Sequence, residues 1–355
     1  MAAPLPPAQL AAMRRAIELS FGQLGATSPN PPVGAVVLND QDQVVGEGAT
    51  QPAGGPHAEV LALRQAGSRA STLVVTLEPC NHTGRTGPCS EALIAAGVKK
   101  VVIGCAEPTA VAAGGAARLS AAGINVRAGV LEEEIAAGPL AAWLHRQATG
   151  RPFVTWKYAA TLDGRSAATD GSSRWITGPE ARADVHRLRG QSDAVIVGVG
   201  TVLADDPSLT ARPDPGHQPL RVILDTHGRT PAAAKVLDGA APTLVVTGGA
   251  TYGEDRTLVQ DGATDGIDLP WLLQQLADRD IVSVLLEGGP TLAGAFWRAG
   301  LIDQAIGYVA PTLLGSGKQA LGDAGVSTID EAILLQLTDI SRLGDDLRLT
   351  MSRRG

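Results

Sequence analysis

Aromatic residues are scarce in this chain of 355 residues, where they make up 3% of the composition. A core with so few rings must be built from Ala, Val, Leu and Ile. Hydrophobic residues at 44% and charged residues at 18% form a globular mixture, which excludes a disordered chain. Because a domain typically holds about 100–200 residues, the length predicts two domains.

Cysteine, basic charge and long apolar runs are also lacking. Three cysteines, an odd and low number, argue against a disulfide framework and favour a reducing cytoplasm. The formal net charge of −7 disfavours a nucleic-acid partner, which would attract a basic protein. No apolar run reaches the roughly 18 residues of a membrane span, and Met1–Pro7 lacks the features of a secretory signal. We therefore expect a cytoplasmic protein with no membrane association.

Hydrophobic periodicity in the first 150 residues alternates between helix and strand. The predicted order is helix 8–24, strands 35–38 and 44–48, helix 57–65, strand 72–77, helix 90–96, strand 99–104, helix 112–121, strand 124–128 and helix 131–147. This order predicts an α/β domain in which helices pack on the faces of one sheet.

The pattern restarts near Gly150-Arg151-Pro152, so the predicted domains are residues 1–150 and 151–355. The second unit is predicted to hold strands at 153–159, 194–199, 220–224, 243–247, 282–286, 304–309, 334–338 and 346–350, with helices at 179–189, 270–277 and 292–298. It is a second α/β domain.

Three short segments of the first domain carry the residue types of a zinc site: Pro56-His57-Ala58-Glu59, Pro79-Cys80 and Pro88-Cys89. One imidazole and two thiolates leave the fourth position of zinc open for water, which is typical of a catalytic site. Glu59 lies two residues past His57 and can carry a proton from water to a leaving amine. This is the pattern of zinc deaminases, which remove an amino group from a nitrogenous ring by hydrolysis.

The alternative for the two cysteines is that they are small buried hydrophobes. Both follow a proline and flank a polar loop, which favours the metal site. Cys105 lies inside an apolar strand and is predicted to be buried and unreactive. In the second domain, Glu287-Gly288-Gly289-Pro290-Thr291 places two glycines between a strand and a helix, where backbone N–H groups can bind a pyrophosphate. Val197-Gly198-Val199-Gly200-Thr201 is a weaker signal, equally well explained as a glycine turn.

The segments TSPNPPVGAVV, PHAEV and LEPCNHTGRTGPC resemble the deaminase half of the bifunctional riboflavin-biosynthesis deaminase–reductase family, including its long loop between the two cysteines. The resemblance implies a cytidine-deaminase-like α/β/α sandwich with one zinc ion per chain. It also implies that His82 and Arg85 line the substrate side of the pocket and that Asn30 contacts the substrate. The run Glu107-Pro108-Thr109-Ala110 departs from the family's usual Asp-Pro-Asn-Pro-like sequence.

The second half, through KYAATLDGRSA, SSRWITG, VGVGTVLADDPSLTAR and LLEGGPTLAGAF, resembles the reductase half of the same family. That half is similar to dihydrofolate reductase in fold and uses NADPH. By this resemblance, the residues that meet the cofactor are Ala159, Trp175, Thr201, Asp205, Gly289, Pro290, Thr291, Leu292, Ala293, Gly294 and Ala295. The residues that meet the phosphoribosyl substrate are Ser173, Arg189, Leu209, Arg212 and Glu287, and Lys157 lies close to both ligands.

The sequence therefore predicts a bifunctional enzyme. The first domain would deaminate 2,5-diamino-6-(5-phosphoribosylamino)pyrimidin-4-one with Glu59 as its proton carrier. The second would then reduce the ribosyl chain to ribityl with NADPH, with Lys157 and Asp205 as catalytic groups. The resemblance also implies a homo-oligomer, a dimer or tetramer, formed through the reductase domain. The alternatives are a nucleobase or nucleoside deaminase, and a second domain that binds nucleotide without catalysis.

Overall fold

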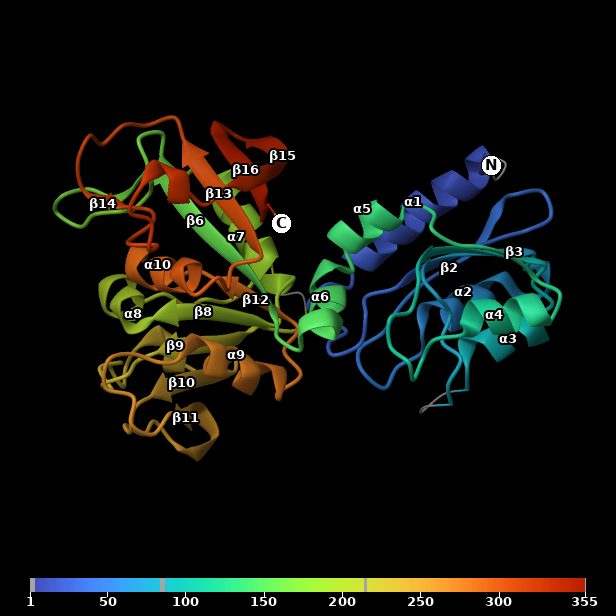
Figure 1. The fold of residues 1–355 in the computed structure, drawn as a ribbon, viewed down its shortest axis with the longest axis horizontal. Coiled ribbons are helices and arrows are strands. Elements are labelled where there is room, and N and C mark those ends of the chain that lie inside the picture. Colours follow the sequence, from blue (N-terminus) through green and yellow to red (C-terminus); the bar gives the residue numbers. More distant parts are fainter. Residues whose placement is uncertain (1–3, 84–86, 214–215, 355) are drawn as a thin grey trace. The chain divides into compact units, whose positions relative to one another are not determined.

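The computed structural model describes residues 4–83, 87–213 and 216–354 and divides the chain into two compact units, Met1–Gly150 and Arg151–Gly355 (Figure 1). The first unit consists of α1 (Pro7–Phe21), β1 (Gly34–Leu38), β2 (Val44–Ala49), α2 (Ala58–Ala66), β3 (Thr72–Leu77), α3 (Cys89–Ala95), β4 (Lys100–Cys105), α4 (Gly115–Ala121), β5 (Asn125–Arg127), α5 (Glu132–Ala137) and α6 (Ala141–Thr149).

The five strands of this unit form one sheet in the order β2-β1-β3-β4-β5, in which β1 is antiparallel to both neighbours and β3, β4 and β5 are parallel. Helices α1 and α2 cover opposite faces. Gly34 lies against α1 and pairs with Ala49, so both residues belong to the α1 face of the sheet. Gly48 is adjacent to Ala49 on β2 and lies against α2. Because neighbouring residues of a strand belong to opposite faces, α2 covers the other face. The first unit is therefore a layered α/β domain.

A single helix over 131–147 is not observed, and this prediction was wrong. The chain instead forms α5 and α6, separated by Gly138, Pro139 and Leu140. Pro139 has no N–H for a helical hydrogen bond and disfavours helical geometry at the residue before it. Gly138 accordingly has non-helical dihedral angles, φ −103° and ψ −115°.

The second unit contains β6 (Phe153–Thr161), β7 (Arg165–Ala167), α7 (Pro179–Gly190), β8 (Ala194–Gly198), α8 (Val199–Asp205), β9 (Leu220–Leu224), β10 (Thr243–Thr247), β11 (Thr257–Val259), α9 (Leu269–Ala277), β12 (Ser283–Leu286), α10 (Pro290–Arg298), β13 (Gln304–Ala310), β14 (Lys318–Gln319), β15 (Leu335–Leu343) and β16 (Asp346–Arg353). Helix α8 and the short strands β7, β11 and β14 were not predicted.

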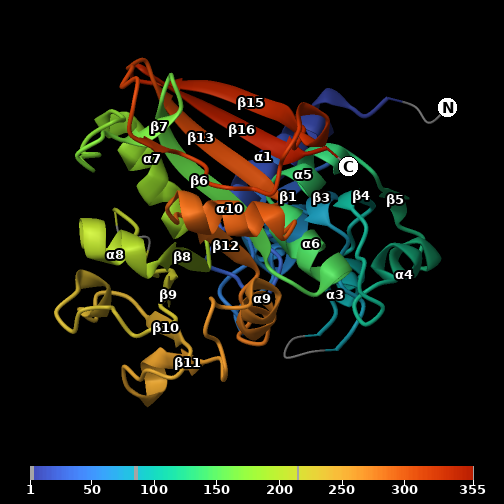
Figure 2. The same cartoon turned by 60° about the vertical axis from the view of Figure 1, so that its left-hand side comes forward.

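The main sheet of this unit has nine strands in the order β11-β10-β9-β8-β12-β6-β13-β16-β15. Its strands are parallel from β11 to β13, and β16 and β15 are added antiparallel at one edge (Figure 2). One face packs against α9 and α10, and the opposite face packs against α7 and Val202 of α8. Helices on both faces explain why β8, β9 and β10 read as continuous apolar runs.

Within the described residues, the structure has no helix with the length and apolar character needed to cross a bilayer.

Candidate active sites

Close packing of α2 on β2 positions the first ligand candidate. A Cβ atom on Gly48 would lie 2.1 Å from the carbonyl oxygen of Ala58, so only glycine lets the first turn of α2 approach this closely. His57 occupies the N-cap of α2. Glu59 lies in the first turn and is 4% exposed.

A backbone hydrogen bond joins the start of α3, which carries Cys89, to Cys80. Cys89 begins α3, and the N–H of Ser90 donates to the carbonyl oxygen of Cys80 (3.2 Å). Glu78, just before Pro79-Cys80, accepts from the N–H of Ala116 (2.8 Å) and from the N–H of Glu107 (3.1 Å). This carboxylate therefore fastens the segment that carries Cys80 to α4 and to the loop after β4.

His57, Cys80 and Cys89 converge. The Nδ1 atom of His57 lies 3.3 Å from Sγ of Cys89 and 3.7 Å from Sγ of Cys80, and the three ligand atoms lie within 4.8 Å of one another. In tetrahedral zinc, bonds of about 2.3 Å to sulfur and about 2.0 Å to nitrogen separate N and S by roughly 3.5 Å. The spacing of the donor atoms therefore fits zinc.

The electrostatics favour thiolate at Cys80, whereas the side chain of Cys80 and burial raise the pKa of Cys89. The side chain of Cys89 lowers the pKa of Cys80 to about 4; burial opposes this shift, and the neighbouring His57 reinforces it. The N–H of Cys89 also points to Sγ of Cys80 (3.5 Å), at the N-terminal end of α3, where the helix dipole stabilises negative charge. Burial raises the pKa of Glu59 above its usual value.

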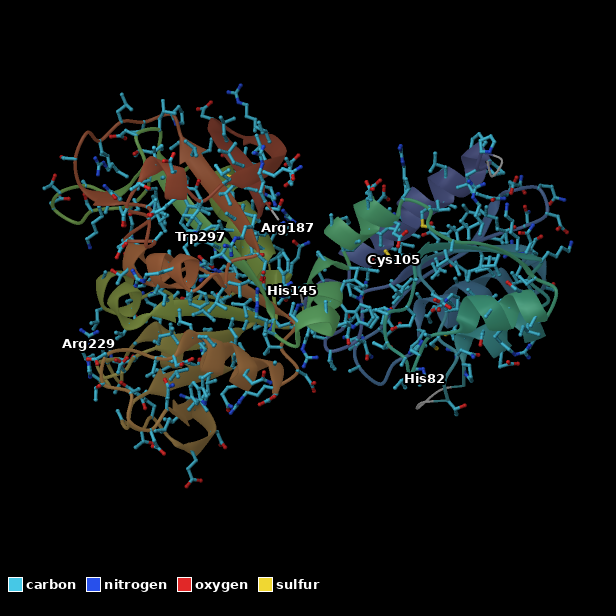
Figure 3. The ribbon with its side chains drawn as sticks, viewed as in Figure 1. His82, Cys105, His145, Arg187, Arg229 and Trp297 are labelled. Carbon is cyan, nitrogen blue, oxygen red and sulfur yellow. The ribbon has the colours of Figure 1, made fainter. Side chains whose placement is uncertain are left out.

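The other residues named for the deaminase half have different surroundings. Asn30 is half-buried, and its N–H donates to the carbonyl oxygen of Thr27 (2.9 Å). His82 is half-buried and its Nδ1 atom is buried without a hydrogen-bond partner. Arg85 lies outside the described residues. Cys105 is 3% exposed, and Figure 3 shows it well apart from His82.

Burial raises the pKa of the Cys105 thiol to about 11. This agrees with the prediction that Cys105 is a buried residue of low reactivity, since thiols react as thiolates. In the unusual run after β4, the carboxylate of Glu107 accepts from the N–H (2.9 Å) and from the hydroxyl (2.5 Å) of Thr109.

In the second unit, three residues far apart in sequence meet in one buried cluster. Glu287, which follows β12, accepts two hydrogen bonds from the guanidinium of Arg189 on α7, at 2.6 and 2.9 Å. The Nζ atom of Lys157 on β6 lies 3.6 Å from the same carboxylate. The side chains of Lys157, Arg189 and Glu287 are 17%, 14% and 7% exposed.

This cluster joins two basic side chains to one carboxylate. Burial by itself would raise the pKa of Glu287, but Arg189 and Lys157 more than offset burial and bring it to about 2. Burial lowers the pKa of Lys157, and Arg189 lowers it further against the opposing effect of Glu287. Glu287 and Arg189 are therefore held as an ion pair, and burial and Arg189 both disfavour the protonated form of Lys157 beside them.

The segment after α8 lies next to this cluster. Leu209 is buried and has a left-handed backbone, with φ 53°. The carbonyl oxygen of Thr210 accepts from Nη1 of Arg189 (3.3 Å), and the hydroxyl of Thr210 accepts from Nε of the exposed Arg212 (3.4 Å). Arg189, Leu209, Arg212 and Glu287 are thus brought together through Thr210 and direct contacts.

The residues named for the cofactor gather around two turns. Gly289 caps α10, and Thr201 lies in α8; a Cβ atom on Gly289 would lie 3.8 Å from Oγ1 of Thr201, so the two turns adjoin. Within the run that follows, Ala293 is buried in the core, and Gly294 is buried against the backbone of Asp323. Ala159 is half-buried on β6, against the α7 face of the sheet.

Trp175 is exposed, whereas Ser173 and Asp205 are half-buried. Trp175 is 69% exposed, and the guanidinium of Arg182 lies 4.5 Å from its ring centroid. Asp205 contacts Arg174, whose Nη2 donates to the Asp205 carbonyl oxygen at 2.5 Å and lies 3.9 Å from its carboxylate.

Two residues with clear local roles were missed by sequence reasoning. Glu78 anchors the Cys80 segment, and Arg182 stacks on Trp175. Glu78 stood within a recognised motif, but its partners lie about 30 and 40 residues away and carry no sequence signal. Arg182 lies in a predicted helix, and no sequence pattern there indicates that its guanidinium stacks on the Trp175 ring.

Comparison with known proteins gives two family matches. Residues 8–105 match the cytidine and deoxycytidylate deaminase zinc-binding region, and residues 152–349 match the RibD C-terminal domain. The chain belongs to the RibD family. The riboflavin biosynthesis protein RibD of Mycobacterium tuberculosis (strain CDC 1551 / Oshkosh) is 50% identical over 349 residues, covering 97% of each chain.

Other members agree over nearly the full length. RibD of Escherichia coli (strain K12) is 41% identical over 95% of this chain and 97% of its own. The structure of Acinetobacter baumannii RibD superposes with a TM-score of 0.87 at 42% identity, covering 98% and 99% of the two chains. A Thermotoga maritima structure, described as a diaminohydroxyphosphoribosylaminopyrimidine deaminase/5-amino-6-(5-phosphoribosylamino)uracil reductase, has a TM-score of 0.89 at 36% identity over 98% and 99%.

The predicted fold class, two α/β domains of the deaminase and reductase types, is therefore confirmed. This RibD chain is a bifunctional enzyme of riboflavin biosynthesis with zinc deaminase and NADPH-dependent reductase activities. A deaminase with a non-catalytic second domain is not favoured, because the second half matches the RibD reductase domain.

Proposed function

We propose that residues 1–150 deaminate 2,5-diamino-6-(5-phosphoribosylamino)pyrimidin-4-one and that residues 151–355 reduce the deaminated product's ribosyl chain to ribityl. The observation that carries the proposal is the His57, Cys80 and Cys89 cluster beside buried Glu59, in a chain that aligns with RibD proteins end to end. The description of the Thermotoga relative supports these two substrates.

In the deamination, His57, Cys80 and Cys89 would hold zinc, and the metal when bound would lower the pKa of water from about 15.7 towards 7. Glu59 takes a proton from the attacking water and gives it to the departing amino group. The new C–O bond replaces the ring C–N bond, and ammonia leaves. Asn30, His82 and Arg85 orient the substrate. Glu59 suits the proton transfers because it lies one helical turn or less from His57 and is shielded from solvent.

The reduction needs one hydride at the sugar's C1 carbon, which NADPH would supply when bound, and one proton to complete the balance. Lys157, buried beside Glu287, is the proposed proton source, and Asp205 orients polar atoms near the reacting carbon. Arg189 and Arg212 attract the substrate phosphate, because guanidinium forms charge-assisted hydrogen bonds with phosphate oxygens. Glu287 holds Arg189 in place, and Ser173 and Leu209 complete the substrate side.

The cofactor meets Ala159, Trp175, Thr201 and Asp205 in this proposal. The N-terminus of α10, from Gly289 to Ala295, receives the pyrophosphate, since helix N-termini attract anions. Ala293 and Gly294 are buried and hold α10 in place. Gly289, Pro290 and Thr291 form the N-cap and first turn of the helix.

We also propose a homo-oligomer formed through the reductase domain. Leu337, Ile340 and Leu347 share one face of the β15–β16 hairpin and are 49%, 57% and 43% exposed. β15 is the edge strand of its sheet, and an exposed apolar edge favours pairing with a second chain. A cytoplasmic location is proposed from the three free cysteines, which suit a reducing compartment.

The test is an assay of ammonia release and NADPH oxidation on the full chain and on Glu59→Gln. The variant keeps the shape of Glu59 but cannot accept a proton, so ammonia release should fall by about 10²-fold or more with zinc retained. NADPH oxidation with deaminated substrate should stay near normal. Unchanged ammonia release would remove Glu59 from the mechanism, and loss of both activities would show that the units do not work independently.

A further inference from the structure

The segment 209–212 carries two of the residues assigned to the reductase substrate, yet it lies outside regular secondary structure. Its backbone is held in a conformation that a leucine seldom adopts, since Leu209 has φ 53°. Such a segment needs tertiary contacts to keep it in place. Gln218 exchanges two hydrogen bonds with the backbone of Ala211, and the contacts made to the carbonyl oxygen of Thr210 come from α7.

His186 supplies the shortest of the contacts from α7. Its Nδ1 atom lies 3.1 Å from the carbonyl oxygen of Thr210. Nη1 of Arg189 also lies near this nitrogen, but at 3.5 Å, so the shorter contact to the carbonyl oxygen sets the tautomer. Because a carbonyl oxygen only accepts, Nδ1 carries the hydrogen and donates it. Arg189, one turn further along α7, donates to the same oxygen at 3.3 Å, but its Nε and Nη2 atoms are committed to Glu287.

The protonation state agrees with this assignment. Burial lowers the pKa of His186, and Arg189 and Arg212 lower it further, although the Thr210 carbonyl and Glu287 oppose them. The imidazole is therefore neutral at neutral pH, with its single hydrogen on Nδ1. A neutral donor here adds no third cation beside Arg189 and Arg212.

We propose that His186 is a positioning residue of the reductase. By donating to Thr210, it holds the segment that presents Leu209 and Arg212 to the phosphoribosyl substrate. The hydroxyl of the same Thr210 accepts from Nε of Arg212. Thr210 therefore links the two residues, because its carbonyl oxygen bonds to His186 and its hydroxyl bonds to Arg212. This inference rests on the proposed function, which assigns Leu209 and Arg212 to the substrate.

The test compares His186→Asn with His186→Leu in the full chain. Asparagine places a side-chain N–H donor close to the position of Nδ1, whereas leucine keeps apolar bulk and has no donor. For His186→Leu, we expect the KM for the deaminated substrate to rise about three- to tenfold, the loss of one hydrogen bond. Its kcat, its KM for NADPH and its ammonia release should change little. His186→Asn should recover most of the effect.

A second measurement reads the segment without substrate. Hydrogen–deuterium exchange of the peptide covering residues 206–213 should accelerate in His186→Leu and not in His186→Asn. Arg187→Gln is the matched control, because Arg187, labelled in Figure 3, is the next residue on α7. Its guanidinium bonds to Asp184 and Gln191 and not to Thr210. Arg187→Gln should leave both the exchange and the substrate KM unchanged.

Unchanged exchange in His186→Leu would overturn the inference, as would equal effects of leucine and asparagine, which would indicate packing. Faster exchange with an unchanged substrate KM would also overturn it. Arg212→Ala separates this last result from failure of the proposed function. If Arg212→Ala raises the substrate KM, the substrate assignment stands and only the role of His186 falls. If it does not, the substrate assignment itself is wrong.

Discussion

At the scale of single residues, both proposed sites depend on charged groups that are stable only because their partners are close. Glu287 would be costly to bury alone, but it lies between Arg189 and Lys157. Cys80 is held towards thiolate by Cys89 and His57. In each case the sequence supplies the ionisable group, and a residue from another element sets its charge.

The first prediction concerns zinc. Cys80→Ser replaces a thiolate ligand with a hydroxyl, a much poorer ligand, so the protein should lose most of about one zinc per chain. Metal analysis of the purified variant measures this loss. Cys105→Ser is the control, because Cys105 is absent from the ligand cluster and should leave zinc content unchanged. Full zinc content in Cys80→Ser would contradict the ligand assignment.

The second prediction concerns acid stability. The pKa of Glu287 falls from 4.5 to about 2 on folding, so its ionised form stabilises the folded state above about pH 4.5. This contribution is lost as the pH falls from about 4.5 to about 2.

Glu287→Gln leaves Arg189 and Lys157 buried without their anion, which should cost about 3–5 kcal/mol near pH 7. The difference in unfolding free energy between wild type and variant should shrink steadily below pH 4.5. Urea unfolding of the reductase unit at several pH values measures it. A difference that does not depend on pH between 7 and 3 would show that Glu287 does not carry this charge effect.

At the scale of elements, helix packing on the sheet sets where the ligands stand. Gly48 admits the first turn of α2 to β2, and Gly115, the first residue of α4, lies against the carbonyl of Pro79. These contacts place His57 and Cys80, which come from different layers of the domain. A Cβ atom at either glycine would push the helix away and would separate the side chains of His57 and Cys80.

The third prediction tests that packing. A Cβ atom at position 115 would meet the carbonyl oxygen of Pro79 at 1.8 Å, so Gly115→Ala must displace the backbone next to Cys80. We expect a loss of about 1–3 kcal/mol in stability and weaker zinc retention under chelator challenge. Gly22→Ala, whose nearest neighbour would lie at 3.4 Å, should behave as wild type. Equal zinc retention in the two variants would disprove the coupling.

At the scale of the whole molecule, the two units are separate compact bodies with separate chemistry. Each has its own sheet and its own candidate site, and the proposed product of the first is the proposed substrate of the second. The order of the two reactions follows from this pairing of substrate and product.

The fourth prediction addresses assembly. Ile340→Lys places a charge on the exposed apolar face that Ile340 shares with Leu337 and Leu347. A charged side chain there opposes burial of this face against a second chain. Light scattering should show a shift from oligomer to monomer, with ammonia release preserved. Thr338→Lys on the same strand is the positional control. A wild-type chain that is already monomeric would refute an oligomer, and an unshifted Ile340→Lys would place the interface elsewhere.

The sequence by itself determined most elements and the three residues of the proposed zinc site, which the structure brings together. Periodicity located strands 72–77, 220–224 and 243–247 at their observed bounds, because strands buried on both faces are unbroken apolar runs. The spacing of His57, Glu59, Cys80 and Cys89 indicated the zinc site, since that chemistry demands particular residue types near helix starts. The break at Gly138-Pro139 was also readable from local sequence, although the periodicity of the surrounding residues concealed it.

Only the tertiary structure decided which distant groups meet. Lys157, Arg189 and Glu287 are separated by 32 and 98 positions in the chain and converge because β12 pairs with β6 and α7 packs on the same face. His186 gains its partner because an irregular segment passes beside α7. Local propensity acts over a few residues, whereas strand order and helix packing join segments a hundred residues apart. The charge state of a buried group depends on those neighbours.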